Sequence, residues 1–365
     1  KNMNKHKINV KEIPKEIKDH ETRVGASPLG VAELAHHGHK ILVEKNAGAA
    51  IGYTDKDYLK AGAKIAKNAA ELYKNSKLII KVKEPQESEV KLIRSEQIIF
   101  SYLHLAAEKK LTKALIKSNC IAIAFETVEN EQGQLPLLSP MSEVAGRLAV
   151  QAGAAYLLKH NGGRGLLIGG VPGVEAVNTV IIGGGVVGIN AAQIAHGMGS
   201  KVYILDNSLD RLRYLNQLFD QKIHTIFSSQ QNLQHYSKKA DLLIGAVLLP
   251  GATAPKLVSQ KMVAKMKPKS VIVDVAIDQG GCIETSRPTS HSRPTFSKEN
   301  VIHYCVTNMP AAAAKTATRA LENATLPYSI ALANSGYEAA FAKDQNFAKG
   351  LNICKGEITY PALLS

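Results

Sequence analysis

Short aliphatic runs and amphipathic stretches alternate along most of the chain. Aliphatic runs bounded by glycine or polar residues are typical of buried parallel strands, and the stretches between them have the apolar spacing of helices. This alternation predicts an α/β fold with parallel sheets. The expected strands are Ile41–Glu44, Leu78–Val82, Ile98–Leu103, Cys120–Glu126, Thr179–Ile182, Lys201–Leu205, Leu242–Ala246, Val271–Val275 and Val301–Val306. The expected helices include Pro28–His37, Lys109–Ser118, Met141–His160, Leu209–Phe219 and the stretch AAAAKTATRALENATL between Pro310 and Pro327.

One segment interrupts the alternation. Residues Asn130–Pro140 contain Gly133, Pro136 and Pro140, which disfavour both helix and strand. A chain of 365 residues is also longer than one compact core usually supports. We therefore expect two domains that are joined at this segment.

A glycine turn marks the strongest candidate site. The segment TVIIGGGVVGINAAQIAHGMG has a strand, a GxGxxG turn and a helix in the order of a dinucleotide-binding unit. Gly183 would allow the tight turn, Gly185 the approach of a pyrophosphate, and Gly188 the packing of the helix on the strand. Val186 and Val187 would begin the helix whose N-terminus faces the phosphates. The alternative is a turn that only packs a helix onto a strand.

The next strand indicates which nucleotide is bound. The run KVYILD ends at Asp206, and a carboxylate there accepts hydrogen bonds from ribose hydroxyls and repels a 2′-phosphate. Arg211 and Arg213 follow closely and argue in the other direction, since a guanidinium accommodates a 2′-phosphate. On balance the pattern favours NAD over NADP as the cofactor.

Composition and charge argue against several other classes of partner. The net charge is +14, but the lysines are spread along the chain and form no stripe, and Trp is absent. We therefore expect no nucleic-acid partner, although the positive charge can help to steer acidic substrates. The sequence has neither an apolar signal-like segment near its start nor an uninterrupted apolar stretch long enough for a membrane span. The predicted location is the cytoplasm.

The four cysteines do not form a motif. Cys120, Cys282, Cys305 and Cys354 are far apart and include no CxxC pair, so neither a disulfide framework nor a metal site is expected. The first three lie in or beside apolar runs, as small buried hydrophobic residues do.

Two basic positions are candidates for binding an acidic ligand. Arg23 lies in ETRVG, and a guanidinium can clamp a carboxylate through two hydrogen bonds. Lys81 and Lys83 follow the run LII, where a parallel strand would end beside a ligand crevice. From pattern alone, the simpler interpretations are a surface arginine and a pair of solvated lysines.

Two further positions are candidates for proton transfer. His104 follows IIFSYL at a predicted strand end, although a histidine in so apolar a run is often a core residue. In VIVDVAIDQGG, Asp274 lies within a predicted strand and Asp278 at its end, beside Gly280 and Gly281. Asp278 is therefore a plausible active-site acid, and the alternative is a turn cap.

At these residues the sequence resembles the alanine dehydrogenase family, and the resemblance covers nearly the whole chain. It is carried by PKEIKDHETRV, KVKEP, FSYLHLAA, FETVE, LPLLSPMSEVAGRLA, GGRGLLIGGVPGV, VDVAIDQGGC and VTNMP, in the order and spacing of the family. Extra residues before INVKEIPKE are expected to form a loose extension. The end, KGEITYPALLS, is expected to stop soon after the family's terminal helix begins.

The resemblance implies reversible oxidative deamination of L-alanine to pyruvate and ammonium, with hydride transfer to NAD. It implies that Arg23 and Lys83 bind the substrate, that His104 is the catalytic acid/base, and that Asp278 is its acidic partner. It also places the cofactor against the glycine turn and a set of further residues. These are Ser142, Asp206, Arg211, Ser228, Val247, Leu248, Asn308 and Met309.

The resemblance also implies an architecture. Residues 1–136 and 315–365 would form a discontinuous α/β substrate domain, and residues 137–314 an inserted Rossmann domain, with the active site in the cleft between them. The family is typically hexameric. Two other functions are weighed against this one: the NAD-binding component of a nicotinamide nucleotide transhydrogenase, and a catalytically silent NAD-binding protein.

Overall fold

The computed structural model describes residues 10–249 and 253–364. The predicted extension at the start of the chain lies outside these residues. The chain divides into a discontinuous unit, Lys1–Met141 with Ala313–Ser365, and an inserted unit, Ser142–Ala312. Each unit has its own mainly parallel sheet flanked by helices, which confirms the predicted α/β fold with one domain inserted in another.

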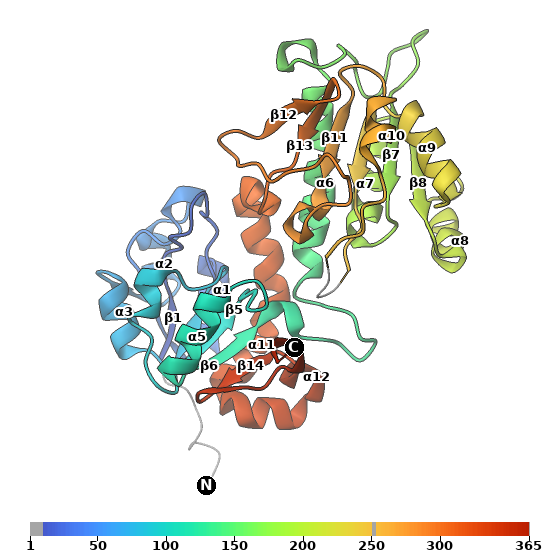
Figure 1. Cartoon of the computed structure of the whole chain (residues 1–365). Helices are drawn as coiled ribbons and strands as arrows, with labels where there is room; N and C mark the ends of the chain where they lie inside the picture. The colour runs from blue at the N-terminus through green and yellow to red at the C-terminus, as the bar shows by residue number, and fades with distance from the viewer. Residues whose placement is uncertain (1–9, 250–252, 365) are drawn as a thin grey trace. The chain divides into compact units, whose positions relative to one another are not determined.

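Among the described residues the inserted unit has a seven-stranded sheet in the order β12-β13-β11-β10-β7-β8-β9 (Figure 1). Strands β8 and β9 lie on one side of β7, and β10, β11 and β13 on the other, all parallel; only β12 is antiparallel. This is the strand order of a Rossmann dinucleotide-binding domain. The strands are β7 (Asn178–Ile182), β8 (Lys201–Asp206), β9 (His224–Phe227), β10 (Leu242–Gly245), β11 (Val271–Asp274), β12 (Thr295–Lys298) and β13 (Val301–Tyr304). The helices are α6 (Ser139–Tyr156), α7 (Val186–Gly197), α8 (Leu209–Leu218), α9 (Gln230–Lys239) and α10 (Gln260–Ala264).

The described part of the discontinuous unit repeats this plan in an eight-stranded sheet ordered β15-β14-β6-β5-β4-β1-β2-β3. Strands β1 to β6 are parallel, whereas β14 and β15 extend the sheet beyond β6 in antiparallel fashion. The strands are β1 (Val10–Ile13), β2 (Lys40–Glu44), β3 (Lys64–Ala66), β4 (Leu78–Ile80), β5 (Ile98–Ser101), β6 (Ile121–Ala124), β14 (Leu351–Cys354) and β15 (Glu357–Ile358). The helices are α1 (Pro28–His36), α2 (Asp55–Lys60), α3 (Ala69–Asn75), α4 (Glu87–Val90), α5 (Lys109–Ser118), α11 (Ala314–Lys343) and α12 (Gln345–Ala348).

In each sheet the strand order reverses at a neighbouring pair, β1 beside β4 and β7 beside β10. Ligands of doubly wound sheets bind outside the carboxyl ends of the strands at such a switch point. The fold therefore gives each unit one edge at which binding residues are expected.

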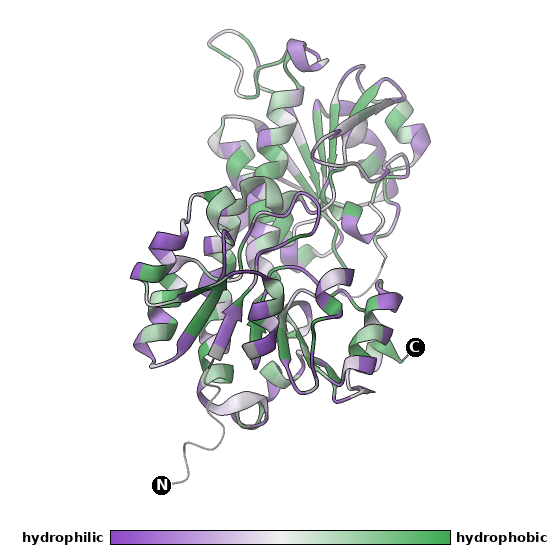
Figure 2. Cartoon of the chain, turned by 90° about the vertical axis from the view of Figure 1, so that its left-hand side faces the viewer, coloured by the Kyte–Doolittle hydropathy of each residue, from purple (hydrophilic) through white to green (hydrophobic). Residues whose placement is uncertain are grey.

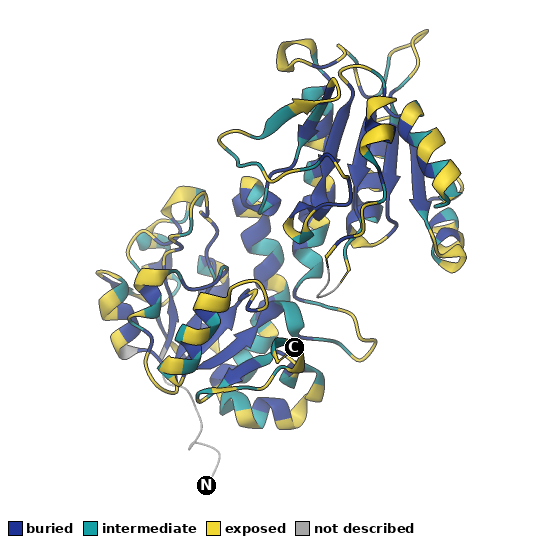
Figure 3. Cartoon of the chain, in the orientation of Figure 1, coloured by how far each residue is buried: buried dark blue, intermediate teal, exposed yellow. Residues whose placement is uncertain are grey.

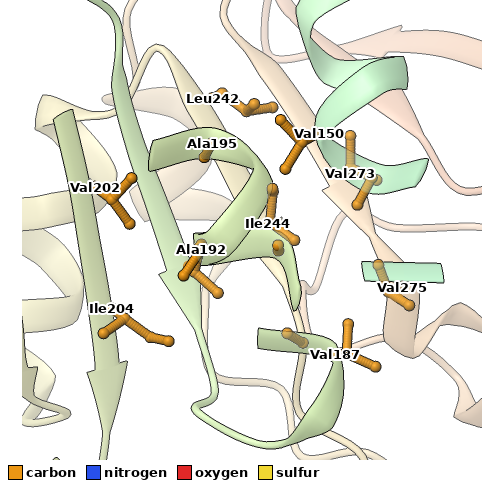
Figure 4. Packing of buried hydrophobic residues seen from close by; sticks show 14 of the residues in the cluster. Val150, Val187, Ala192, Ala195, Val202, Ile204, Leu242, Ile244, Val273 and Val275 are labelled. Carbon is orange, nitrogen blue, oxygen red and sulfur yellow. The ribbon is translucent and has the colours of Figure 1, made fainter. Parts of the chain in front are cut away.

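The inserted sheet is buried on both faces. Ile181 packs into the apolar cluster on one face, and its neighbours Val180 and Ile182 pack into the cluster on the other. Figure 4 shows how closely α7 approaches the first face, where Ala192 and Ala195 lie among aliphatic side chains from the strands. The central strands are accordingly hydrophobic in Figure 2 and buried in Figure 3, while the outer faces of the helices are exposed.

Three sequence-based expectations about the elements need correction. Helix α6 spans Ser139–Tyr156 rather than Met141–His160, because Leu158 adopts an extended conformation and a short 3-10 turn follows it. The helix after Pro310 does not stop at Pro327 but runs to Lys343, with a break in helical geometry at Gly336. Six strands escaped prediction because they are short or carry charged or polar residues, namely β1, β3, β9, β12, β14 and β15.

The cysteines agree with another expectation. Cys120, Cys282 and Cys305 are buried, as their apolar surroundings predicted, and no cysteine of the described residues is in a disulfide. In the part of the chain that the structure describes, no helix is long and apolar enough to span a membrane.

Strand β1 carries a buried acid whose titration should govern stability. Glu12 is completely buried, and the Ser76 hydroxyl and the Arg94 guanidinium only partly offset that burial, which raises the pKa of Glu12 to about 8. Because the folded state favours the protonated carboxyl, its contribution to stability is complete below the ordinary pKa of 4.5 and is lost as the pH rises toward 8. Glu12→Gln should remove this dependence and raise the free energy of unfolding at pH 7 by up to roughly 3 kcal/mol.

Chemical denaturation between pH 5 and pH 8.5 measures this effect. Glu131→Gln, which changes an exposed carboxylate of the same unit, is the matched control and should retain the wild-type pH dependence. A Glu12→Gln protein whose stability follows the same pH curve as the wild type contradicts the assignment.

Candidate active site

The glycine turn of the inserted unit has the geometry of a phosphate-binding turn. Gly183 has a φ of 106°, and a Cβ atom there would lie 2.7 Å from the Ala246 carbonyl oxygen. A Cβ on Gly188 would lie 1.8 Å from the Gly183 carbonyl oxygen, so α7 could not pack at this distance with a larger residue. Gly185 is the N-cap of α7, and no described atom lies within 4 Å of the Cβ it lacks. Space is thus left where the helix N-terminus would attract an anion.

Asp206 and Arg211 are both attached to this turn. Asp206 ends β8, and its carboxylate accepts hydrogen bonds from Gly184 N at 2.9 Å and from Ser208 N at 2.8 Å. Arg211 donates from Nε to the Gly184 carbonyl oxygen. Arg213 instead pairs with Asp210 on the surface, at 2.7 Å. Arg211, one of the two arginines that favoured NADP, therefore binds the glycine turn through its Nε.

Four further residues that were predicted to contact the cofactor lie just after strands or in the first turns of α6. Ser228, after β9, donates its N–H to the Asp206 carbonyl oxygen at 2.9 Å, and Val247 and Leu248, after β10, are half-buried. Ser142 is half-buried in the first turns of α6. All four residues are therefore partly exposed to solvent.

Two of the predicted cofactor residues are core residues by their side chains. Val187 and Met309 are each 2% exposed and belong to the main apolar cluster of the inserted unit. Only their backbone groups are available to a ligand. By contrast, Val186 is 37% exposed at the start of α7.

Asp278 lies in the 3-10 turn η4 (Val275–Gln279), immediately after β11, and is exposed. Its carboxylate accepts a hydrogen bond from Asn308 N at 3.2 Å, and Asn308 itself is in the left-handed region with a φ of 55°. The cap of η4 is Asp274, whose side chain accepts from Ala276 N, so Asp278 does not cap its own turn. The structure brings Asp278 and Asn308 together at the carboxyl edge of the inserted sheet.

In the discontinuous unit, Arg23 lies in the loop that follows β1. The side chain is 2% exposed, which excludes an ordinary surface arginine. Its Nε and Nη2 atoms bind the two carboxylate oxygens of Glu21 at 2.8 and 2.7 Å, and Nη1 donates to Met141 Sδ at 3.1 Å. The Glu21 carboxylate outweighs the cost of burial and raises the pKa of Arg23, which therefore stays charged. Glu21 is a site residue that the sequence analysis missed.

The loop that carries Arg23 is fixed by a helix from the far end of the chain. Val24 N donates to Thr318 Oγ1 at 3.3 Å. Ser27 donates to Glu322 from its backbone N at 2.5 Å and from its hydroxyl at 2.7 Å. Because Thr318 and Glu322 belong to α11, the return of the chain to this unit positions the Arg23 loop.

The two lysines after β4 have different environments. Lys83 is half-buried, and its charge together with that of Lys18 lowers the pKa of Glu84. Lys81 is completely buried between Glu16, at 3.1 Å, and Glu89, at 2.9 Å. The interpretation of both residues as solvated surface lysines is therefore wrong for Lys81.

His104 stands in a turn just after β5. Its side chain is 44% exposed, so it is not a core histidine. The backbone has a φ of 50°, and the N–H groups of Leu103 and His104 donate to the Glu126 carboxylate at 3.2 and 2.6 Å. His104 Nδ1 lies 4.0 Å from Glu126 Oε1. Glu126, which follows β6 in the FETVE motif, was not predicted as a site residue, although a carboxylate at a strand end was a usable signal.

The carboxyl edges of the two sheets suit different ligands. Arg23, Lys83 and His104 follow β1, β4 and β5, so the discontinuous unit gathers two cations and an imidazole at one sheet edge, as an anionic substrate that exchanges protons requires. The inserted unit offers a glycine turn, a helix N-terminus and a strand-end carboxylate, which fit a dinucleotide. Among the described residues no group of three or more His, Cys, Asp or Glu side chains is arranged to hold a metal ion.

Comparison with known proteins identifies the family. Residues 12–145 match the family described as alanine dehydrogenase/PNT, N-terminal domain, and residues 149–361 match alanine dehydrogenase/PNT, C-terminal domain. Alanine dehydrogenase of Halomonas elongata is 51% identical over 96% of this chain and 95% of its own length. Alanine dehydrogenase of Methanococcus maripaludis is 53% identical over 96% of this chain and 94% of its own length.

Solved structures give the same result. An L-alanine dehydrogenase superposes with a TM-score of 0.94 at 48% identity, covering 97% of this chain and 98% of that one. A transhydrogenase from Sinorhizobium meliloti shares the fold, with a TM-score of 0.82, at a sequence identity of 23%. With both halves matched and about half of all residues identical over nearly the full length, this chain belongs to the alanine dehydrogenase/PNT family.

Proposed function

We propose that the protein is an NAD-dependent L-alanine dehydrogenase, EC 1.4.1.1, which converts L-alanine and water reversibly to pyruvate and ammonium. The observation that carries this proposal is the set of Arg23, Lys83 and His104 at one sheet edge of a chain that is half identical to alanine dehydrogenases. Bound NAD would supply the acceptor for the hydride that leaves the α-carbon.

The residues of this chain would perform the other steps. Glu21 holds the Arg23 guanidinium in place through Nε and Nη2, and a substrate carboxylate would be bound by Arg23 together with Lys83. Holding the carboxylate fixes the α-carbon for hydride transfer and retains the resulting imine. His104 would remove and return protons as water adds to the imine and ammonium leaves, with Asp278 as its acidic partner.

Steady-state rates with the purified chain test the proposal. We expect NADH absorbance to appear with L-alanine and NAD, and pyruvate with NADH and ammonium to run the reaction backwards. No NADH should form with D-alanine or in the absence of an amino acid. Reduction of NADP by NADH without alanine would instead indicate a transhydrogenase component, and dinucleotide binding without either reaction would indicate a silent NAD-binding protein.

The preference for NAD can be tested at Asp206. Asp206→Asn keeps one acceptor oxygen for the glycine turn but removes the charge that repels a 2′-phosphate. The ratio of kcat/KM for NAD to that for NADP should fall about ten-fold, which corresponds to about 1.4 kcal/mol. Asp210→Asn, a nearby exposed acid paired with Arg213, is the control and should leave the ratio unchanged. An unchanged ratio in Asp206→Asn would show that this carboxylate does not select the nucleotide.

Assembly and location stay predictions. The hexamer that the family resemblance implies can be checked by light scattering of the purified chain, and the cytoplasmic location by fractionation of cells that express it.

A further inference from the structure

Asp274 is a buried acid to which the proposed mechanism gives no task. It ends β11 and is 0% exposed, so it can touch neither substrate nor cofactor. Its carboxylate is nevertheless surrounded by donors: Ala276 N at 3.2 Å, Cys282 N at 3.4 Å and Ile283 N at 3.2 Å, with Cys282 Sγ at 3.6 Å. The chain from Val275 to Ile283 thus closes in a loop around this side chain.

A carboxylate is required for this closure. Ala276 N and Cys282 N donate to Oδ1, whereas Ile283 N donates to Oδ2, so both oxygens must accept. An asparagine would turn an NH₂ group toward one of these backbone N–H groups and break either the cap of η4 or the closure at Ile283. Burying the Asp274 carboxylate costs free energy because it loses its water. Hydrogen bonds to both of its oxygens offset that cost.

The neighbouring backbone is packed directly against the same pair of side chains. A Cβ atom on Gly245, the last residue of β10, would lie 2.6 Å from Cys282 Sγ and 2.8 Å from Asp274 Oδ1. On Gly281, whose φ is 79°, it would lie 2.7 Å from Asp274 Oδ2. The two strand ends β10 and β11 are therefore held in register around Asp274 and Cys282.

From this pair, contacts lead to the segments that would bind the cofactor. Gly245, which packs against Asp274 and Cys282, leads directly into Ala246 and Val247. Gly183 packs so closely against these two residues that a Cβ there would be 2.7 Å from the Ala246 oxygen and 3.1 Å from Val247 Cγ2. On the other side, the Asp274 cap begins η4, the turn that carries Asp278.

We propose that Asp274, with Cys282, is a positioning residue for both the cofactor and the acid: it sets the Ala246–Val247 segment against the glycine turn and fixes the turn that presents Asp278. The effect on catalysis rests on the proposed function, whereas the effect on dinucleotide binding does not.

Asp274→Asn tests the proposal against Asp241→Asn. Asp241 is also a buried acid of the inserted sheet, 6% exposed, but it precedes β10 at the opposite edge, where Asn178 N and Lys267 Nζ donate to it at 3.0 and 2.9 Å. Three quantities are measured for each full-length protein: the Kd of NADH by fluorescence titration, kcat with L-alanine, and the thermal midpoint.

We expect Asp274→Asn to raise the Kd of NADH about ten-fold and to lower kcat about 10²-fold, because small displacements of a catalytic group are that costly. Asp241→Asn should lower the thermal midpoint but leave both quantities within about two-fold of wild type. Two results overturn the proposal: an Asp274→Asn protein with wild-type Kd and kcat, or equal losses in Asp241→Asn at an equal fall in midpoint. If the wild type itself does not oxidise alanine, the proposed function fails, and the NADH titration still decides the positioning role.

Two further variants keep the test decisive. If Asp274→Asn does not fold, Cys282→Ala removes only the thiol that contacts Asp274 and packs against Gly245. It should weaken NADH binding about three- to ten-fold, and unchanged binding overturns the proposal. In an Asp278→Ala background, Asp274→Asn should lower kcat less than about two-fold further, since it acts through the residue already removed. If Asp274→Asn lowers kcat in this background by the same factor as in the wild type, the proposed effect on Asp278 is wrong.

Discussion

Replacing His104 by asparagine is expected to lower kcat for L-alanine oxidation by about 10²–10⁴-fold, the usual contribution of a positioned acid/base. Asparagine is chosen because it tolerates the left-handed backbone that His104 adopts at a φ of 50°. It also leaves the backbone N–H that donates to Glu126 in place. The expected loss is therefore that of the imidazole and not of the turn.

Two measurements make this result specific. The Kd of NADH should stay within about two-fold of wild type, because the glycine turn and Asp206 belong to the inserted unit and His104 does not. His36→Asn, which changes an exposed histidine at the end of α1, should retain full activity. If His104→Asn keeps more than about a tenth of the wild-type rate at every pH, another group performs the proton transfer.

Replacing Lys81 by methionine is expected to destabilise the protein by about 3–5 kcal/mol, the usual cost of removing one partner from a buried ionic group. Lys81 is 0% exposed and binds Glu16 and Glu89, so methionine would leave two buried carboxylates without their cation. Glu16 also accepts the Val82 N–H at 2.7 Å, so the strand end that leads to Lys83 should loosen as well. Chemical denaturation monitored by circular dichroism measures the change.

A surface pair provides the comparison. Lys91 and Glu87 are 3.9 Å apart and largely exposed, so Lys91→Met should cost less than about 1 kcal/mol. Adding Glu16→Gln and Glu89→Gln to Lys81→Met should restore part of the lost stability, because the buried charges are then removed together. A Lys81→Met protein as stable as Lys91→Met would show that the buried group is not an ionic one.

Most of the fold could be predicted because its strands are buried on both faces. Runs such as Val180–Ile182 are apolar throughout, and their order with helices between them defines a parallel α/β sheet. Strand β1 could not be found in this way: its sequence VKEI is half charged, yet Lys11 and Glu12 are both completely buried. Edge strand β9 was missed for the opposite reason, since HTIF is largely exposed and has little apolar signal.

The candidate site could be predicted only where its chemistry is local. The glycine turn and Asp206 lie within one βαβ unit, so their spacing in the sequence reflects their spacing in the fold. The partners of the catalytic candidates are different: Glu126 is 22 residues from His104, and Glu16 is 65 residues from Lys81. Such pairings are created by the order of strands in the sheet, and one sequence without its fold does not contain them.

The proposed reaction moves a hydride from the α-carbon of L-alanine to a nicotinamide. The most direct measurement uses L-alanine carrying deuterium at that carbon, incubated with the protein and NAD, followed by mass spectrometry of the reduced nucleotide. We predict that the NADH formed carries one deuterium for each pyruvate released. Reduced nucleotide without deuterium, or pyruvate formed without nucleotide reduction, would contradict the claim.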